Sequence, residues 1–266
     1  MIWPLFKANI KNNRFIWILM TVIFCFYMFM VIFMYDPKSS EAMDEVLKLL
    51  PEGLINALGM STFGSSLFDF LSSYIYGMLI FLFPMITSIV INHRMLASTI
   101  DNGSMAYIVA TPNSRKKIAI TQALFSIISI TLLAIVVTAF SVLIAISLHP
   151  GELEIGKFLL LNLYALLMYY AIGGIGFFAS SISSESKTSL GIGIGVPVGF
   201  VVIQMLGNID PDTSWIGNFS LYKLFAPEKV ASLNWFIFLG MGVFLILGIA
   251  LYLGGIYYFD KRNLYI

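Results

Sequence analysis

The chain has 266 residues, of which 59% are hydrophobic and 11% are charged, and its mean hydropathy is +0.91. Because a soluble domain carries roughly a quarter charged residues, this composition excludes an ordinary soluble protein and predicts an all-α integral membrane protein. The single cysteine, Cys25, excludes a disulfide framework, and because the two histidines and this cysteine are far apart in sequence we expect no metal site. We expect no nucleic-acid partner.

The N-terminal segment, residues 1–14, is predicted to form an interfacial helix. Its basic residues Lys7, Lys11 and Arg14 fall at helical spacing on one face, and the opposite face is apolar. Trp3 would then lie at headgroup depth. The alternative is a frayed basic terminus that only sets the orientation of the chain.

Six long apolar segments follow, and they predict six transmembrane helices in a single domain that covers residues 1–266. Each segment is about long enough to cross roughly 30 Å of hydrocarbon, and none contains Asp, Glu, Lys, Arg or His. Pro84 is expected to kink the second span, and the third, with 31 residues, must tilt or project beyond the membrane. The predicted spans are 15–35, 70–92, 118–148, 158–182, 190–206 and 235–259.

Residues 36–69 and 207–233 are predicted to be outer loops that carry short amphipathic helices. Ser40 can cap a helix with an acidic first turn, and the apolar stripe that follows is interrupted at Pro51. In the second loop the apolar residues are Trp215, Phe219, Leu221, Tyr222, Leu224 and Phe225.

The distribution of charge predicts the orientation of the chain. With residues 93–117 and both termini in the cytoplasm, the inner segments hold 10 of the 15 basic residues but only 3 of the 14 acidic ones, Asp101, Glu185 and Asp260. The ten basic residues are Lys7, Lys11, Arg14, Arg94, Arg115, Lys116, Lys117, Lys187, Lys261 and Arg262. The chain is therefore predicted to be a multi-pass protein with both termini cytoplasmic.

The lack of ionisable residues in the six segments weighs against a proton-coupled carrier, although sodium sites built from carbonyls and hydroxyls remain open. The spacing from Gly151 to Lys157 matches a phosphate-binding loop, but Phe158 stands where a serine or threonine must bind magnesium. We therefore interpret this stretch as a turn. We expect no catalytic residue and no cofactor in this chain, so any ATPase must be a separate subunit.

The inner loop 93–117 carries the strongest functional signal. Residues 101–104 predict a turn or helix start, and Thr111 with Pro112 predicts the cap and first turn of the next helix. Between them, residues 105–109 form a short apolar-rich segment that suits insertion into a groove of a partner. The alternative is that this segment lies on the membrane surface.

At this loop the chain resembles the permease subunits of the type-two ATP-binding-cassette (ABC) exporters. Their corresponding loop reads roughly acidic-x-Gly-Thr-Leu-x-x-Leu-Leu-x-x-Pro-x-Ser-Arg-Arg-x. Here Ser104 replaces the threonine, and residues 93–95 stand where the family often has acids. The basic start, the six spans, the large loops after spans one and five and the ending of the chain agree with the family. The matching residues are Asp101, Gly103, Ser104, Met105, Ile108, Val109, Pro112, Ser114, Arg115 and Lys116.

The resemblance implies an exporter in a cell membrane, bacterial by family habit, that docks two copies of a cytoplasmic ABC ATPase on this loop, with Tyr107 among the coupling residues. It also implies pairing with a second permease, either identical or related. ATP and magnesium would bind to the ATPase, so this chain is expected to be neither an enzyme nor a cofactor protein. The cargo would be an amphipathic or hydrophobic peptide, drug or lipid.

Gly191, Gly195 and Gly199 recur every four residues in the fifth predicted span, and this spacing allows close approach between helices. These glycines can pack within one chain or between two chains. The resemblance favours a position near the dimer contact and the transport path.

Two other classes of function remain open at this point. One is a stand-alone channel or a sodium-linked secondary carrier, and the other is a membrane subunit that only anchors a partner. Co-purification of a separate ATPase with the chain distinguishes both from the exporter.

Overall fold

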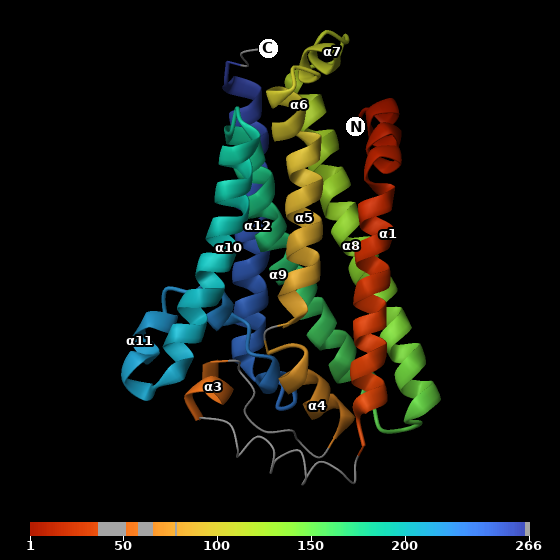
Figure 1. Cartoon of the computed structure of the whole chain (residues 1–266), viewed down its shortest axis with the longest axis vertical. Helices are drawn as coiled ribbons and strands as arrows, with labels where there is room; N and C mark the ends of the chain where they lie inside the picture. The colour runs from red at the N-terminus through yellow and green to blue at the C-terminus, as the bar shows by residue number, and fades with distance from the viewer. Residues whose placement is uncertain (37–51, 58–65, 78, 264–266) are drawn as a thin grey trace.

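A computed structural model describes residues 1–36, 52–57, 66–77 and 79–263, which form a bundle of helices (Figure 1). No strand occurs among these described residues. The elements are α1 (Trp3–Met34), α3 (Glu52–Ala57), α4 (Leu67–Tyr74), η1 (Leu79–Phe81), α5 (Leu82–Met95), α6 (Ala97–Asp101), α7 (Met105–Val109), α8 (Arg115–Leu148), α9 (Ile155–Ile182), α10 (Ser186–Ile209), η2 (Pro211–Thr213), α11 (Ser214–Gly217), η3 (Leu221–Leu224), η4 (Pro227–Val230) and α12 (Trp235–Lys261).

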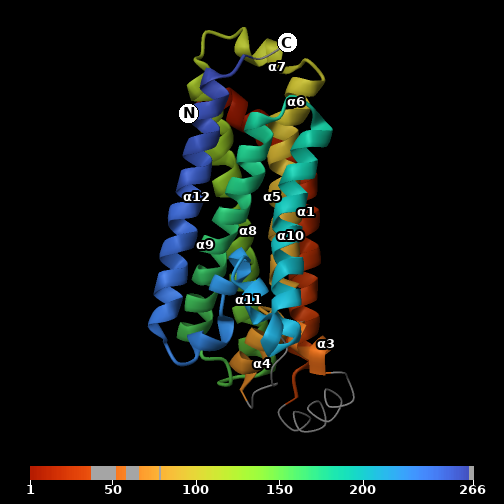
Figure 2. The ribbon, with the colours of Figure 1, turned by 90° about the vertical axis from the view of Figure 1, so that its left-hand side faces the viewer.

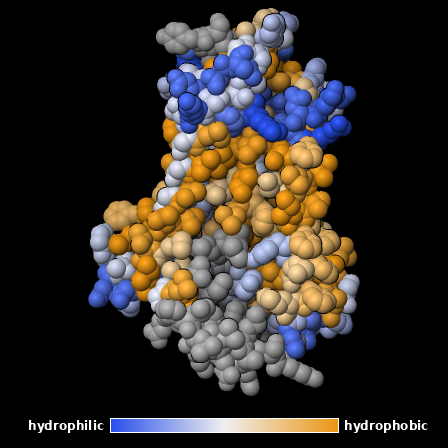
Figure 3. Space-filling model, viewed as in Figure 1, coloured by the Kyte–Doolittle hydropathy of each residue, from blue (hydrophilic) through white to orange (hydrophobic). Residues whose placement is uncertain are grey.

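The long helices form two layers, with α1, α5 and α10 in one and α8, α9 and α12 in the other (Figures 1 and 2). Helix α9 is the centre of the bundle. In its most apolar stretch of 18 residues, 56% of the residues are buried, against 17% in the corresponding stretch of α10. Both termini, α6 and α7 lie at one end, which we call the basic end, and α3, α4 and α11 lie at the opposite end. An apolar surface covers the middle of the bundle between these ends (Figure 3).

The predicted boundary between an interfacial helix and the first span is wrong. Helix α1 runs without interruption from Trp3 to Met34, and its first turns pack against α8 and not only against lipid. The rings of Phe6 and Phe125 meet edge to face at 5.3 Å, and the buried Asn9 side chain donates a hydrogen bond to Gln122 Oε1. Tertiary contacts therefore occupy part of the face that the sequence pattern assigns to the membrane interface.

The second predicted span, 70–92, is not one helix. Helix α4 ends at Tyr74, and α5 begins only at Leu82, after a turn and the short helix η1. The 14 residues of α5 extend about 21 Å, less than the roughly 30 Å of a hydrocarbon core. Pro84 lies in the first turn of α5, where a missing N–H costs nothing, so the predicted kink at Pro84 is also wrong.

The break in the second span is buried inside the protein, and tyrosine and asparagine side chains bond within it. Tyr76, which is fully buried, donates its hydroxyl to Asn162 Oδ1 over 2.9 Å. The hydroxyl of Tyr169 donates to the carbonyl oxygen of Ile80 over 3.2 Å. Non-helical backbone is tolerated at membrane depth where protein groups replace water in this way.

The other predicted spans lie within long helices. Among the described residues, five helices are long and apolar enough to cross a membrane: α1, α8, α9, α10 and α12. They contain the predicted segments 118–148, 158–182, 190–206 and 235–259, and α1 contains all but the last residue of the first segment. The 34 residues of α8 extend about 51 Å, which exceeds one membrane thickness as expected.

The two predicted outer loops are described only in part. The predicted helix capped by Ser40 lies outside the described residues. In the second loop, the apolar set divides: Trp215 and Phe219 are exposed, whereas Tyr222 and Phe225 are buried against the bundle.

Helices α10 and α11 make a close contact that only glycine allows at one position. A Cβ atom on Gly207 would lie 2.5 Å from Gly217 Cα, whereas a Cβ atom on Gly217 would meet Gly207 Cα at an ordinary 3.6 Å. Backbone atoms cannot rotate away as a side chain can. The two positions are therefore unequal, although both are glycines in the same contact.

We predict that Gly207→Ala lowers the free energy of unfolding by a net value of about 1–2 kcal/mol, because the clash outweighs the better helix propensity of alanine. Gly217→Ala is the matched control and should leave stability unchanged or slightly higher. Unfolding in mixed detergent micelles, followed by circular dichroism, measures both variants. Equal stability of the two would contradict this account of the α10–α11 contact.

Candidate docking site at the basic end

The residues between α6 and α7 form a turn that is fixed by its own side chains, as the sequence predicts. Gly103 has a φ of 74°, a left-handed conformation that favours glycine. The backbone N–H of Ser104 donates to Asn102 Oδ1 over 2.9 Å, and the Ser104 hydroxyl donates to the carbonyl oxygen of Thr99. The turn therefore sets the direction in which α7 leaves the bundle.

Helix α7 is anchored to the bundle by Met105 and presents Tyr107 to the outside. Met105 is fully buried in a cluster with Leu96, which links α5 to α6, and with Ile118 and Phe259 at the ends of α8 and α12. Ile108 and Val109 pack partly against the same cluster. Tyr107, in contrast, is 81% exposed. The five apolar-rich residues are thus divided between an internal anchor and one projecting aromatic side chain.

Asp101 connects this loop to the beginning of α10. Its Oδ2 atom accepts a hydrogen bond from the backbone N–H of Ser186 over 3.3 Å, and Ser186 is the first residue of α10. A carboxylate is favourable at a helix N-terminus because it opposes the helix dipole. Hydrogen bonds from Ser186 lower the pKa of Asp101, and nearby His93 and Lys187 act in the same direction. The carboxylate is therefore charged at neutral pH.

Two arginines continue the connection to α8, α9 and α12. Arg115 donates to the carbonyl oxygen of Arg262 over 3.0 Å. Arg262 in turn donates to the carbonyl oxygens of Ser181 and Ser183, at 2.6 and 3.0 Å, and to the hydroxyl of Ser184. Hydrogen bonds at the basic end thus join α6 to α10, and join α8 and α12 to the end of α9.

The cap of α8 differs from the sequence prediction. Ser114, not Thr111, is the N-cap, and its hydroxyl accepts a hydrogen bond from the N–H of Lys117. Thr111 donates its hydroxyl to the carbonyl oxygen of Ile108 and so belongs to the end of α7. Pro112 lies exposed between the two helices and not in the first turn of α8.

Sequence reasoning assigned Arg115 to a partner and gave Arg262, Ser181, Ser183 and Ser186 no role at the site. The structure shows that Arg115 is bonded within the chain. The only sequence signal for Arg262 was its position directly after an apolar span, which is typical of orientation signals in general. Its partners lie about 80 positions away along the chain, so spacing could not reveal them.

The arrangement suits docking of a protein partner. The surface of this end is polar (Figure 3), and α7 stands beyond the ends of the long helices (Figure 1). Among the described residues there is no group of three or more His, Cys, Asp or Glu side chains that could hold a metal ion. A rigid turn, an anchored helix and one exposed tyrosine offer a surface to a protein partner.

The predicted glycine ridge on α10 faces away from its own chain. A Cβ atom on Gly191, Gly195 or Gly199 would meet no atom within 4 Å. Gly193, on the opposite side of the same part of the helix, packs inside, and a Cβ there would lie 3.6 Å from Ile89. Packing of the ridge against the described part of its own chain is therefore excluded, whereas contact with a second chain or with lipid remains.

Three comparisons with known proteins bear on the identity of the chain. A family model described as "ABC-2 family transporter protein" matches residues 6–264, which is nearly the whole chain. A search of curated proteins and a search of solved structures each returned no match.

We predict that Arg262→Ala lowers the free energy of unfolding by about 1–2 kcal/mol, since charged hydrogen bonds are lost at a partly exposed position. Amide hydrogen exchange should also rise across residues 183–188, which lead into α10. Lys261→Ala is the control, because Lys261 is exposed. Unchanged exchange in Arg262→Ala would show that these hydrogen bonds do not hold the helix ends together.

Proposed function

The chain belongs to the ABC-2 transporter family as a membrane permease subunit, and on this basis we propose that it is the permease of an ABC exporter. Its energy comes from a separate cytoplasmic ATPase that docks on α7 and the adjoining turns. The observation that carries this proposal is the combination at α7 of a buried anchor, Met105, and a projecting side chain, Tyr107. Exposed aromatic residues on a fixed support are typical of binding hot spots.

The orientation that the proposal needs is supported by charge. The basic residues gather at the end that carries α7 and both termini, and this end is cytoplasmic by the positive-inside rule. In that orientation the cell membrane surrounds the apolar middle of the bundle (Figure 3). The ATPase, which binds ATP and magnesium, then meets α7 from the cytoplasm.

The contacts of α7 provide a route by which a docked partner moves the bundle. A force on Tyr107 reaches Met105 within the same short helix, and Met105 is packed against the ends of α5, α8 and α12. Asp101 passes the same force to the first residue of α10, Ser186. Because packed cores shift as units and not continuously, closure of the ATPases is expected to switch these helices together between inward-open and outward-open states.

The outward ridge of Gly191, Gly195 and Gly199 supports pairing of two permeases. In lipid, helices associate by close packing between small residues, since lipid gives no hydrophobic drive between them. The proposed assembly has two permeases, identical or related, and two ATPases. Its cargo is an amphipathic or hydrophobic molecule that leaves the cell.

Docking and orientation are tested together with single cysteines in a Cys25→Ser background. Ala110→Cys places a reporter at the exposed end of α7, and it should react with an impermeant thiol reagent in inside-out vesicles but not in intact cells. Adding the ATPase should protect it. A further Tyr107→Asp substitution should abolish the protection, because it places a charge in the contact.

Ser214→Cys at the opposite end is the matched reporter. It should react in intact cells and remain indifferent to the ATPase. Reaction of Ala110→Cys in intact cells would overturn the orientation, and reaction that the ATPase leaves unchanged would overturn the docking site.

The pairing proposal predicts that Gly195→Leu reduces the dimer fraction in detergent and ATP-driven transport in vesicles, without loss of folded permease. The new side chain enters open space in the isolated chain, so its effect must come from a second chain. Gly242→Leu on α12 has an equally open position and is the control. Full dimerisation and full transport by Gly195→Leu would show that the ridge faces lipid.

A further inference from the structure

Three basic side chains on α1 have no role in the docking site at α7. Lys7, Lys11 and Arg14 are exposed and share one face of the helix. Lys7 already has a contact, since its ammonium group lies 5.4 Å from the centre of the Trp3 ring. Lys11 and Arg14 form no ion pair within the described part of the chain. Because both are exposed, an anion from outside the chain can reach them.

The surroundings of these two cations contain no acid on the nearest helices. Neither α1 nor α8, which packs beside it, contains an aspartate or a glutamate. The three acids predicted for the cytoplasmic side belong to other elements: Asp101 ends α6, Glu185 precedes α10, and Asp260 lies in the last turn of α12. Charge complementarity therefore favours an anionic partner at the beginning of α1.

An apolar groove between α1 and α8 adjoins Arg14. It holds about 270 Å³, and among the described residues that line it Arg14 alone is charged. The floor of the groove is fixed, because the indole N–H of Trp17 donates to the carbonyl oxygen of Ser129 over 2.9 Å. Its rim is apolar and open, with Ile18 53% exposed and Leu132 48% exposed. The groove therefore exists without a ligand and is accessible along its length.

The apolar surface continues from this groove toward the middle of the bundle. On α1 the exposed residue one turn beyond Ile18 is Val22, and on α8 the exposed residue one turn beyond Leu132 is Val136. The distance from Arg14 to Val22 along the helix is about 12 Å. Figure 3 shows the same order in the view of Figure 1, with hydrophilic atoms over the first turns of α1 and the apolar surface directly beyond them. The sequence of a charged head and an apolar tail matches a membrane lipid.

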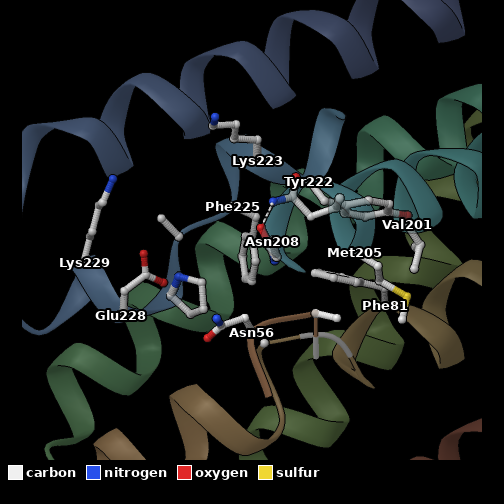
Figure 4. Close-up of a pocket in the computed structure, with 15 residues that line it drawn as sticks. Asn56, Phe81, Val201, Met205, Asn208, Tyr222, Lys223, Phe225, Glu228 and Lys229 are labelled. Atoms are coloured by element: carbon white, nitrogen blue, oxygen red, sulfur yellow. Dashed lines mark hydrogen bonds between the residues drawn. The ribbon is translucent and has the colours of Figure 1, made fainter. Parts of the chain in front are cut away.

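Two other hollows in the structure lack this combination. The groove between α8 and α12 holds about 320 Å³, and none of the described residues that line it is charged. The cavity at the end opposite α7, of about 470 Å³, is lined by Glu228 as well as by Lys223 and Lys229, so its charges are mixed (Figure 4). Near this cavity the hydroxyl of Tyr222 and Oε1 of Gln204 have no hydrogen-bond partner in the described part of the chain, but each exposes less than 1 Å² and cannot be reached from it.

We propose that the groove between α1 and α8 binds one anionic phospholipid. Its phosphate contacts Lys11 and Arg14, which are three residues apart and therefore neighbours on the helix surface. The guanidinium group can make two parallel hydrogen bonds to phosphate oxygens, and the lysine adds a point charge. One acyl chain follows Ile18 and Leu132 toward the middle of the bundle. Basic pockets between membrane helices bind anionic headgroups in general.

A zwitterionic lipid fits this site less well. It carries the same phosphate together with an ammonium group, which two cations without a neighbouring acid repel. The proposed lipid site lies on α1 and α8, away from α7, and it depends neither on export nor on an ATPase.

The experiment uses the full chain in phosphatidylcholine nanodiscs without the ATPase. The probe is a phosphatidylglycerol with a diazirine midway along one acyl chain, and the crosslinked residues are identified by mass spectrometry. The probe should label Ile18, Ile128 or Leu132, and unlabelled phosphatidylglycerol should displace it. A phosphatidylcholine with the same diazirine should label this groove at least fivefold less.

Arg14→Gln should reduce labelling of the groove by the phosphatidylglycerol probe about fivefold, the effect expected for one cation beside an anionic lipid. Arg14→Lys keeps the charge and should keep most of the labelling. Lys187→Gln is the matched control, because it removes one exposed charge at the same end of the bundle, on α10, and should leave labelling unchanged. Circular dichroism verifies that each variant is folded.

Two further comparisons identify the ligand. The groove between α8 and α12 is the internal reference, since Ile249 there should be labelled equally by both lipid probes in every variant. Glycerol phosphate carries the headgroup charge without an acyl chain and should not displace the probe, even in excess.

Three results with these probes would overturn the proposal: equal labelling of the groove by both lipids, native labelling in Arg14→Gln, or displacement by glycerol phosphate, which would indicate a site for soluble anions. Disulfide-linked pairs of Ile18→Cys in a Cys25→Ser background would also overturn it, because a second permease would then cover the groove. None of these results concerns the ATPase docking test at Ala110→Cys, so the two proposals can fail separately.

Discussion

Backbone groups that leave a helix inside a membrane must find their partners within the protein, because lipid offers none. This constraint acts at residues 75–81, where the second predicted span breaks. The hydroxyl of Tyr169 bonds to the carbonyl of Ile80, and Tyr76 bonds to Asn162, which also accepts from Thr138. These contacts, made largely by α9, let the chain turn inside the protein. The break places Phe81 against Tyr222, and so it joins the segment before α5 to the loop that follows α10.

At the basic end, the fold must hold the short helix α7 in place. Five residues make little more than one helical turn, and such a helix is not stable alone. The burial of Met105 and the fixed turn at Gly103 supply the missing stability. Consequently α7 is held against the ends of α8 and α12, and under the proposed function a partner that binds Tyr107 acts on the bundle as a whole.

The sequence predicted those parts of the fold that depend on local pattern. Uncharged apolar segments of sufficient length and the turn at 101–104 are local features. The structure confirms long apolar helices at α1, α8, α9, α10 and α12, and it confirms the turn between α6 and α7. The break before α5 was missed because Ile75 and Tyr76 are as apolar as the residues of a continuous span. The boundary after residue 14 was wrong because Asn9 finds its partner, Gln122, more than a hundred positions away.

The candidate docking site was also predictable from the sequence only in part. Pattern alone showed that residues 105–109 are apolar in a polar loop, but it could not show which of them face inward. That depends on the cluster around Met105, which is assembled from distant segments. The role of Arg262 was invisible for a related reason, since its acceptors are mainly backbone carbonyls, which every residue type possesses. The unsatisfied hydroxyl of Tyr222 likewise has no signature in the sequence.

The two ends of the protein are joined by α10. It begins at Ser186, beside Asp101, and its last turns carry Gln204 and Asn208 on the cavity. Pro197 lies inside this helix and is buried. A proline removes one backbone hydrogen bond and crowds the carbonyl of the residue four positions earlier, so the two halves of α10 are more weakly coupled there than elsewhere. A movement that enters α10 at the basic end can therefore change the angle between its halves, and the second half carries Gln204 and Asn208 at the opposite end of the bundle.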